Sequence, residues 1–374
     1  MKIAIIDNIE HPVDAHSGFG VEIFTYQLVQ GLIKAGQDVT LFASGDSVTD
    51  AKLESVHSCG TALDKSILPQ NRSFYQDYIF SLLEKNIDSF DIIHSQDHIK
   101  GLLMSYLTDK PVVSTFHDVW SAERTPTSLL RTIAKNAKKH VMVAISENQK
   151  KEMEKDIENV VVIPHGIMLP PLYDTQSTNQ DKILFLGRIN ARKGPGIALE
   201  VANKTNKRLS MYGFTHHPFE KELLDSLTEQ YTANQQIIFH NPIQNEDEKM
   251  KVYTDHRALI FPIQWEEPFG LVQIESMACG TPVIAYARGS VPEVIKDGET
   301  GFIVNSSNED IRGDWIIKKT GVEGLCEAVE RIYAMTEESY KLMRQNCRMH
   351  VEKNFTVQRM VNQYKQLYDA ILNK

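Results

Sequence analysis

The sequence predicts an α/β protein of two domains, each built on a parallel sheet. Short apolar runs alternate with helical patterns along most of the 374 residues, which is typical of repeated βαβ units. A stretch rich in proline, serine, threonine and asparagine interrupts this alternation at 168–180 and has the composition of a linker. We therefore predict a first domain at 1–167, a second domain at 181–353 and a separate final helix at 354–374.

Composition narrows the class of protein. A hydrophobic content of 42 % and a charged content of 24 % are those of a soluble globular chain, and the net charge of −9 argues against nucleic acid as a partner. No apolar run approaches the roughly 20 residues of a membrane span. The start MKIAIIDN enters a strand directly, without the pattern of a signal peptide. We expect a cytoplasmic protein.

The cysteines Cys59, Cys279, Cys326 and Cys347 are scattered along the chain. They form no CxxC pair and have no histidine nearby at the usual zinc spacing. We therefore expect reduced thiols and no metal site.

The first strand, at 2–7, is followed by a loop at 8–20, a helix and a second strand at 38–43. The apolar face of that helix consists of Val21, Phe24, Leu28, Leu32 and Ala35. Gly18 and Gly20 lie in the loop after the first strand, where ligands of open α/β sheets bind. Two glycines are weak support for a site, and a plain turn before a helix explains them equally well.

His117 directly follows an apolar strand at 112–116. At the carboxyl end of a parallel strand its imidazole would face the ligand crevice. A loop histidine satisfied by its neighbours is an equally good interpretation.

A basic helix is predicted at 128–140. Its cationic residues are Arg131, Lys135, Lys138 and Lys139. A weak peripheral membrane contact is one interpretation of this face, and a solvated helix surface is the commoner one.

The second domain opens with an apolar strand at 183–186 and the segment Gly187-Arg-Ile-Asn-Ala-Arg-Lys-Gly194. A strand followed by glycine, arginine and lysine, and then by a helix, presents cations to phosphate. Arg188 and Lys193 are the candidates, although loop charges of this kind also occur without a ligand. Neither a Walker motif nor GxGxxG is present, so hydride chemistry and nucleotide hydrolysis have no support.

Two glutamates are prominent between 261 and 301: Glu267 in a loop and Glu275 on the helix that follows it. Glycosidase carboxylates lie ~5 to 9.5 Å apart, whereas eight helical residues span roughly 12 Å. The pair therefore suits two ends of one long ligand. Between the two glutamates, the amides at the start of the helix form an anion site. These amides belong to Phe269, Gly270 and Leu271.

These motifs together resemble the retaining glycosyltransferases of family 4, which have the GT-B fold. The resemblance rests on Glu267-Pro-Phe-Gly-Leu-x3-Glu275, Met277-Ala-Cys-Gly-Thr-Pro-Val-Ile-Ala285 and Gly289-Ser-Val-Pro-Glu-Val-Ile295, with the Gly-Arg…Lys-Gly segment before them. It covers most of the chain. It implies two Rossmann-like domains that face a central cleft, with the final helix crossing back to the first domain.

The resemblance also implies residue roles. Glu275 would accept hydrogen bonds from the ribose, Glu267 would hold a hydroxyl of the donor sugar, and His117 would touch that sugar from the first domain. Arg188 and Lys193 would stabilise the diphosphate, and the two glycines would allow donor and acceptor to approach the backbone. No DxD motif is present near a strand end, so no metal and no cofactor are expected.

The resemblance thus implies transfer of a hexose from a nucleotide-diphosphate sugar, most commonly a UDP-sugar such as UDP-glucose, to an acceptor hydroxyl. A glycoside hydrolase and a non-catalytic sugar-nucleotide-binding protein are the alternatives. Glycan, lipid and small-molecule acceptors all occur in the family, so the acceptor stays open, as do the donor base and the oligomeric state.

Overall fold

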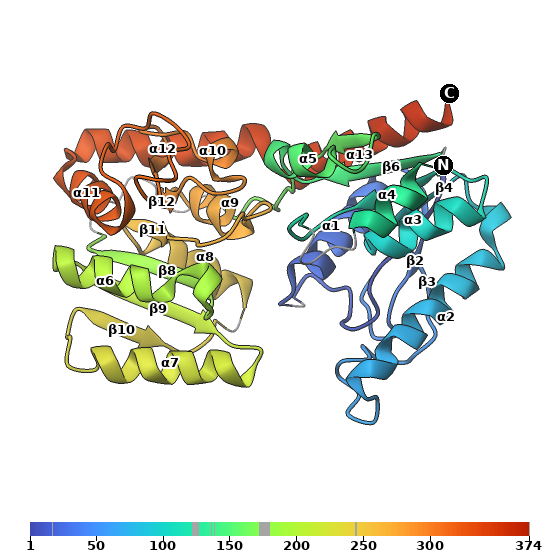
Figure 1. Cartoon of the computed structure of the whole chain (residues 1–374), viewed down its shortest axis with the longest axis horizontal. Coiled ribbons are helices and arrows are strands. Elements are labelled where there is room, and N and C mark those ends of the chain that lie inside the picture. The colour runs from blue at the N-terminus through green and yellow to red at the C-terminus, as the bar shows by residue number, and fades with distance from the viewer. Residues whose placement is uncertain are drawn as a thin grey trace. The chain divides into compact units, whose positions relative to one another are not determined.

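The computed structural model describes residues 1–16, 18–121, 127–135, 137, 139–171, 180–243 and 245–373. Its contacts divide the chain into two compact units (Figure 1). The first unit comprises Met1–Gly166 and Thr356–Lys374, and the second comprises Ile167–Phe355. Most of the linker predicted at 168–180 falls on 172–179, outside the described residues.

The first unit contains a seven-stranded parallel sheet of order β3-β2-β1-β4-β5-β6-β7 (Figure 1). Its strands are β1 (Lys2–Ile6), β2 (Asp38–Phe42), β3 (Lys52–Glu54), β4 (Ile92–Ser95), β5 (Val112–Thr115), β6 (His140–Ala144) and β7 (Val160–Val162). Its helices are α1 (Gly20–Lys34), α2 (Arg72–Glu84), α3 (His98–Leu107), α4 (Thr127–Ala134), α5 (Glu147–Met153) and α13 (Val357–Leu372). The inner strands are short and almost wholly buried, as expected for a parallel sheet covered on both faces, whereas the edge strands β3 and β7 are more exposed.

The second unit contains a six-stranded parallel sheet of order β10-β9-β8-β11-β12-β13 (Figure 1). Its strands are β8 (Lys182–Arg188), β9 (Arg208–Phe214), β10 (Ile237–His240), β11 (Ala258–Phe261), β12 (Val283–Tyr286) and β13 (Gly301–Val304). Its helices are α6 (Pro195–Thr205), α7 (Pro218–Tyr231), α8 (Glu246–Thr254), α9 (Leu271–Ala278), α10 (Val291–Val294), α11 (Gly321–Ala334) and α12 (Glu337–Asn354). Both sheets have the doubly wound order in which ligands bind at the carboxyl ends of the strands.

The final helix, α13, belongs to the first unit, which confirms the predicted return of the chain. It packs against α1 and contributes Met360, Val361, Tyr364 and Tyr368 to the core that covers β1, β2 and β4. Polar groups reinforce this packing, since His94 Nδ1 lies 2.6 Å from the Tyr368 hydroxyl and His94 Nε2 lies 2.8 Å from Thr115 Oγ1.

Some predicted elements differ from the structure. The helix predicted at 128–140 ends at Ala134 as α4, and His140 already belongs to β6. Lys138 of the predicted basic face lies outside the described residues. In the described ranges, the helices all lack the combination of length and hydropathy that would let one span a bilayer.

Candidate functional site

The loop between β8 and α6 brings two cations to the carboxyl edge of the second sheet. Arg188 is the last residue of β8, and the loop then forms a short 3₁₀ turn in which the Asn190 side chain accepts a hydrogen bond from the Lys193 amide at 3.1 Å. The amide of Gln264 donates to the Arg192 carbonyl at 2.7 Å, which holds this loop beside the segment that follows β11. The predicted cations lie at or after the end of β8, and Glu267 follows the neighbouring strand β11. All three side chains are therefore at the carboxyl edge of the second sheet.

Arg188 is held by a carboxylate that the sequence analysis did not identify. Its Nε donates to Glu220 Oε1 at 2.6 Å, and the Glu220 side chain is only 1 % exposed. Burial alone would raise the pKa of Glu220, but hydrogen bonds from the His216 amide, Arg188 and the His217 amide hold it below its usual value. Because the bond uses Nε, the two terminal amino groups of the guanidinium remain available for a bidentate contact with an anion.

Lys193 and Glu267 form a direct ion pair. Lys193 Nζ lies 2.6 Å from Glu267 Oε2, and Trp265 Nε1 donates to the same oxygen at 2.8 Å. The ammonium also lies over the rings of Trp265 and Phe261, at 5.2 and 5.6 Å from their centroids. The side chains of Glu267 and Lys193 are 7 % and 23 % exposed, so this pair is largely shielded from water.

A second loop fixes the backbone of Glu267. The Ser290 amide donates to the Glu267 carbonyl at 2.9 Å, and Ser290 Oγ donates to the Phe269 carbonyl at 2.7 Å. Gly289 has φ of 57°, and a Cβ there would lie 2.2 Å from the Glu267 carbonyl oxygen, so only glycine allows this approach. The loop before α9 is therefore held in one conformation.

Helix α9 begins immediately after this loop. Gly270 is its N-cap residue with φ of 77°, and Leu271 is its first helical residue. The first amides of a helix have no acceptor inside the helix, so they point toward any anion at this end. The Phe269 side chain is buried and packs edge-on against Phe355, so Phe269 has only its backbone to offer a ligand.

Glu275 lies one turn further along α9 and is also oriented by neighbours. Lys249 Nζ contacts its Oε1 at 2.9 Å, and the Tyr253 hydroxyl donates to its Oε2 at 2.9 Å. Both partners come from α8, which packs against α9. Burial would lower the pKa of Lys249, but the charges of Glu275 and Glu246 raise it, so the ammonium stays charged.

His117 of the first unit follows β5 and is partly buried. Its Nε2 lies 2.9 Å from Gln96 Oε1, its ring stacks on His165 with centroids 5.3 Å apart, and Phe24 lies edge-on to it. Burial lowers the pKa of His165 to about 3, so that ring is neutral at physiological pH. His117 is thus a loop histidine with structural neighbours at the carboxyl edge of the first sheet, and both predicted interpretations agree with this placement.

Gly18 lies in the loop between β1 and α1, as predicted, whereas Gly20, also predicted in that loop, is the first residue of α1. Gly18 has φ of 77° with open space around the position of a Cβ. At the same edge the buried carboxyls Asp7 and Glu22 were missed by the sequence analysis. Burial first, and then the charge of Glu22, raise the pKa of Asp7, while burial raises the pKa of Glu22 to about 7.

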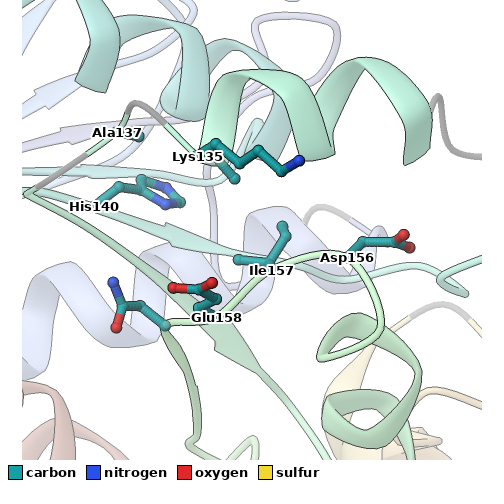
Figure 2. Close-up of a pocket in the computed structure, with 8 residues that line it drawn as sticks. Lys135, Ala137, His140, Asp156, Ile157 and Glu158 are labelled. Carbon is teal, nitrogen blue, oxygen red and sulfur yellow. The ribbon is translucent and has the colours of Figure 1, made fainter.

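A cavity of about 240 Å³ lies in the first unit beside His140, Asp156 and Glu158 (Figure 2). His140 begins β6 and Asn159 directly precedes β7, so the cavity is at the amino ends of these strands. The residues that line this cavity include none of the site residues predicted from the sequence. It is therefore separate from the carboxyl edges where ligands of such sheets bind.

The structure thus brings Arg188, Lys193, Glu267 and Glu275 together at one edge of the second unit, and it places Gly18, Gly20 and His117 at the corresponding edge of the first unit. Glu220, Lys249, Tyr253 and Ser290 were not predicted, because each approaches its partner from a different part of the fold.

Comparisons with known proteins find relatives that match both units. A family model of glycosyltransferase family 4 matches residues 19–169, and a model of the group 1 glycosyl transferases matches residues 174–319. A D-inositol 3-phosphate glycosyltransferase of Xylanimonas cellulosilytica is 23 % identical over 79 % of this chain and 82 % of its own length. Its counterpart in Mycolicibacterium smegmatis is 25 % identical over 79 % of this chain and 76 % of its own length.

Solved structures share the fold along the whole chain. Sucrose-phosphate synthase from Thermosynechococcus elongatus has a TM-score of 0.73 at 23 % identity, covering 100 % of this chain and 99 % of its own. The Anabaena protein HepE, solved with UDP and glucose, has a TM-score of 0.73 at 16 % identity, covering 99 % and 100 %. With its two doubly wound sheets and the two family models that match them in succession, the chain belongs to the family 4 glycosyltransferases of GT-B fold.

Proposed function

We propose that this glycosyltransferase moves a hexose from a UDP-sugar, such as UDP-glucose, to an acceptor hydroxyl with retention at the anomeric carbon. The observation that carries the proposal is the Lys193–Glu267 pair at 2.6 Å, with Arg188 on the adjoining strand end. A nucleotide-diphosphate sugar needs cations for its phosphates and carboxylates for its hydroxyls, and this edge of the second unit has both.

Arg188 and Lys193 stabilise the diphosphate as it leaves. Cleavage of the bond to the anomeric carbon concentrates negative charge on the β-phosphate, so positive groups that are fixed in advance lower the barrier most. Glu220 fixes the guanidinium through Nε at 2.6 Å, and Glu267 fixes the ammonium. The first amides of α9, from Gly270 and Leu271, add hydrogen-bond donors for the same charge.

Glu275 binds the ribose hydroxyls. A carboxylate has about four lone-pair positions, so the two bonds from Lys249 and Tyr253 leave two for a ligand. Lys249 also compensates the charge that Glu275 places in a partly buried position. The ribose lies away from the reacting carbon, so Glu275 contributes to donor affinity more than to the chemical step.

Glu267 binds a hydroxyl of the donor sugar, and the reaction needs no enzyme nucleophile if the leaving phosphate takes the acceptor proton on the same face. His117 is proposed to touch the donor sugar, and Gly18 and Gly20 to allow close approach of the ligand to the backbone. The acceptor is an alcohol of a glycan, a lipid or a small molecule.

The glycoside hydrolase alternative is less compatible with these contacts. It requires one of the two carboxyl groups to be a proton donor. Each accepts a lysine ammonium instead, Glu267 from Lys193 and Glu275 from Lys249, which suits an acceptor of hydrogen bonds. Arg188 and its buried partner Glu220 would also have no task in hydrolysis.

Binding and product analysis test the proposal. UDP-, GDP- and ADP-sugars are compared by thermal shift, since a ligand that binds the folded state raises its melting temperature. We expect the largest rise with a UDP-hexose, followed by transfer that gives a product with the anomeric configuration of the donor by NMR. An inverted product, or release of sugar from a glycoside without nucleotide, contradicts the proposal.

Metal independence is part of the proposal, because Arg188 and Lys193 supply the positive charge that other transferases take from a cation. We expect transfer to survive EDTA. Abolition by the chelator with rescue by Mg²⁺ or Mn²⁺ contradicts this part.

A further inference from the structure

Three side chains with different donor atoms come together in the irregular segment that follows β3. They are the imidazole of His57, the thiol of Cys59 and the carboxylate of Asp64, each partly buried. One potential ligand atom from each lies within 4.8 Å of the other two. Nitrogen, sulfur and oxygen donors in one cluster match the borderline-soft ion Zn²⁺, whereas Mg²⁺ and Ca²⁺ prefer oxygen alone.

The backbone that carries these residues is fixed without their side chains. The Thr61 and Ala62 amides donate to the Ile9 and Glu10 carbonyls at 2.9 and 3.0 Å. A Cβ at Gly60 would lie 2.6 Å from the Glu10 carbonyl oxygen, so the segment is in close contact with the loop that follows β1. The cluster is therefore preorganised, which reduces the entropy lost on binding an ion.

The ligand atoms are also oriented. Asp64 Oδ1 accepts hydrogen bonds from the Ser66 amide at 2.8 Å and from Ser66 Oγ at 2.6 Å, which turns Oδ2 toward His57. The His57 ring lies edge-on to Tyr75, with centroids 5.2 Å apart. Support of this kind around metal ligands sets their geometry and raises affinity.

The spacing of the atoms fits tetrahedral coordination. Two ligands at about 2.0 Å from zinc lie roughly 3.3 Å apart at a tetrahedral angle. The observed distance between His57 Nε2 and Asp64 Oδ2 is 3.1 Å, a hydrogen bond that an ion between the two atoms would replace. Cys59 is a free thiol whose sulfur lies within 4.8 Å of the other two ligand atoms, so only a small side-chain movement would be needed for it to complete the set.

We propose that His57, Cys59 and Asp64 bind one Zn²⁺ ion, with a fourth position open to water. Binding displaces the thiol proton, since the thiolate is the ligand. The order His-x-Cys with Asp64 five residues further differs from the common zinc patterns, which is why the sequence analysis expected no metal. The site is in the first unit and does not depend on the proposed sugar transfer.

The first experiment uses the full-length, tag-free protein after chelation and dialysis, with Co²⁺ as a spectroscopic substitute for Zn²⁺. We expect one equivalent of Co²⁺ to give tetrahedral d–d bands together with a thiolate-to-cobalt charge-transfer band, both removed by Zn²⁺. Cys59→Ser should lose the charge-transfer band, whereas Cys326→Ser should retain it.

Further variants distinguish the loss of a zinc ligand from a general loss of the fold. His57→Gln should weaken Zn²⁺ binding by at least about tenfold, and Ser66→Ala by about tenfold through loss of the bonds that orient Asp64. Circular dichroism of each variant without metal checks that the fold is retained. Failure of one equivalent of Co²⁺ or Zn²⁺ to bind, or a charge-transfer band that persists in Cys59→Ser, overturns the proposal.

Discussion

The two units share one architecture but differ in how several of their buried titratable groups are accommodated. In the first unit, burial favours the neutral form of three histidines and two carboxyls. Burial lowers the pKa of His94, His140 and His165 to about 3, and it raises those of the carboxyls Asp7 and Glu22. A buried group that gives up its charge avoids most of the cost of leaving water.

In the second unit, three carboxylates near the carboxyl edge of the sheet are paired with cationic side chains. Arg188 with Glu220, Lys193 with Glu267 and Lys249 with Glu275 are ion pairs between 2.6 and 2.9 Å long. Such pairs often add little net stability, because desolvation offsets the attraction. Their concentration at the carboxyl edge of the sheet is what the proposed binding of an anionic donor at this edge would require.

The largest effect is expected from Arg188→Met. If the Arg188–Glu220 pair serves the diphosphate, kcat should fall by about 10² to 10³, the usual cost of losing one preorganised donor to a developing charge. Steady-state kinetics measure this, with melting temperature as a check on folding. Arg208→Met is the control, since Arg208 is at the amino end of β9 and pairs with Asp181. A normal kcat in Arg188→Met would show that the Arg188–Glu220 pair has only a structural role. The difference between the two units would then not reflect catalysis.

Glu275→Ala should affect donor affinity. Two hydrogen bonds from ribose to a carboxylate are lost, so KM for the donor should rise about 10- to 100-fold with little change in kcat. Glu246→Ala is a matched control, because Glu246 also pairs with Lys249. A large loss of kcat at unchanged KM would place Glu275 at the reacting carbon instead.

Glu220→Gln should have a smaller effect, about three- to tenfold on kcat. Glutamine can still accept from Arg188 Nε, but its NH₂ group would then face the His216 and His217 amides, which donate to Glu220 Oε2. In the Arg188→Met background the same change should no longer alter kcat, as expected for a residue that acts through Arg188. Equal losses in both backgrounds would show a separate role. Glu222→Gln, on the exposed face of α7, is the control.

The smallest effect concerns the stability of the first unit. The folded-state pKa of Glu22 is about 7, above the ordinary 4.5, so its destabilising effect is absent at acidic pH and grows as pH rises from 4.5 to 7. Glu22→Gln should therefore become more stable than the wild type by at least about 1 kcal/mol above pH 7, and this gain should vanish near pH 4. Denaturant unfolding at several pH values measures the difference. Exposed Glu84→Gln should show no such trend.

The sequence predicted secondary structure well where apolar residues follow the pattern of a buried strand or helix. Strands β1, β5 and β8 and the start of α9 were predicted closely, because each combines a continuous apolar run with turn residues or a terminal glycine. The short edge strand β3 and helix α2, which lie in the less regular segment between β2 and β4, were not predicted. The helix expected at 128–140 was too long, because lysine-rich sequence continued the pattern beyond Ala134.

The candidate site was predictable only in its motif residues. Glu267 and Glu275 are fixed by a local sequence pattern, whereas Glu220 reaches Arg188 from 32 positions away and Lys249 reaches Glu275 from 26. Likewise His57 and Asp64 meet because an irregular segment folds back, and such segments have no periodicity that sequence patterns can reveal. Partners of this kind become visible only in three dimensions.

The return of α13 to the first unit has a consequence for the order in which the protein folds during translation. The core of the first unit includes Tyr364 and Tyr368, so it cannot be completed until residues 356–374 have left the ribosome. All residues of the second unit, 167–355, are synthesised before that point and can fold as a unit. Most of the first unit is synthesised first, yet its core would be completed last. Until α13 packs on them, the apolar faces of β1, β2 and β4 would be exposed and would need protection from aggregation.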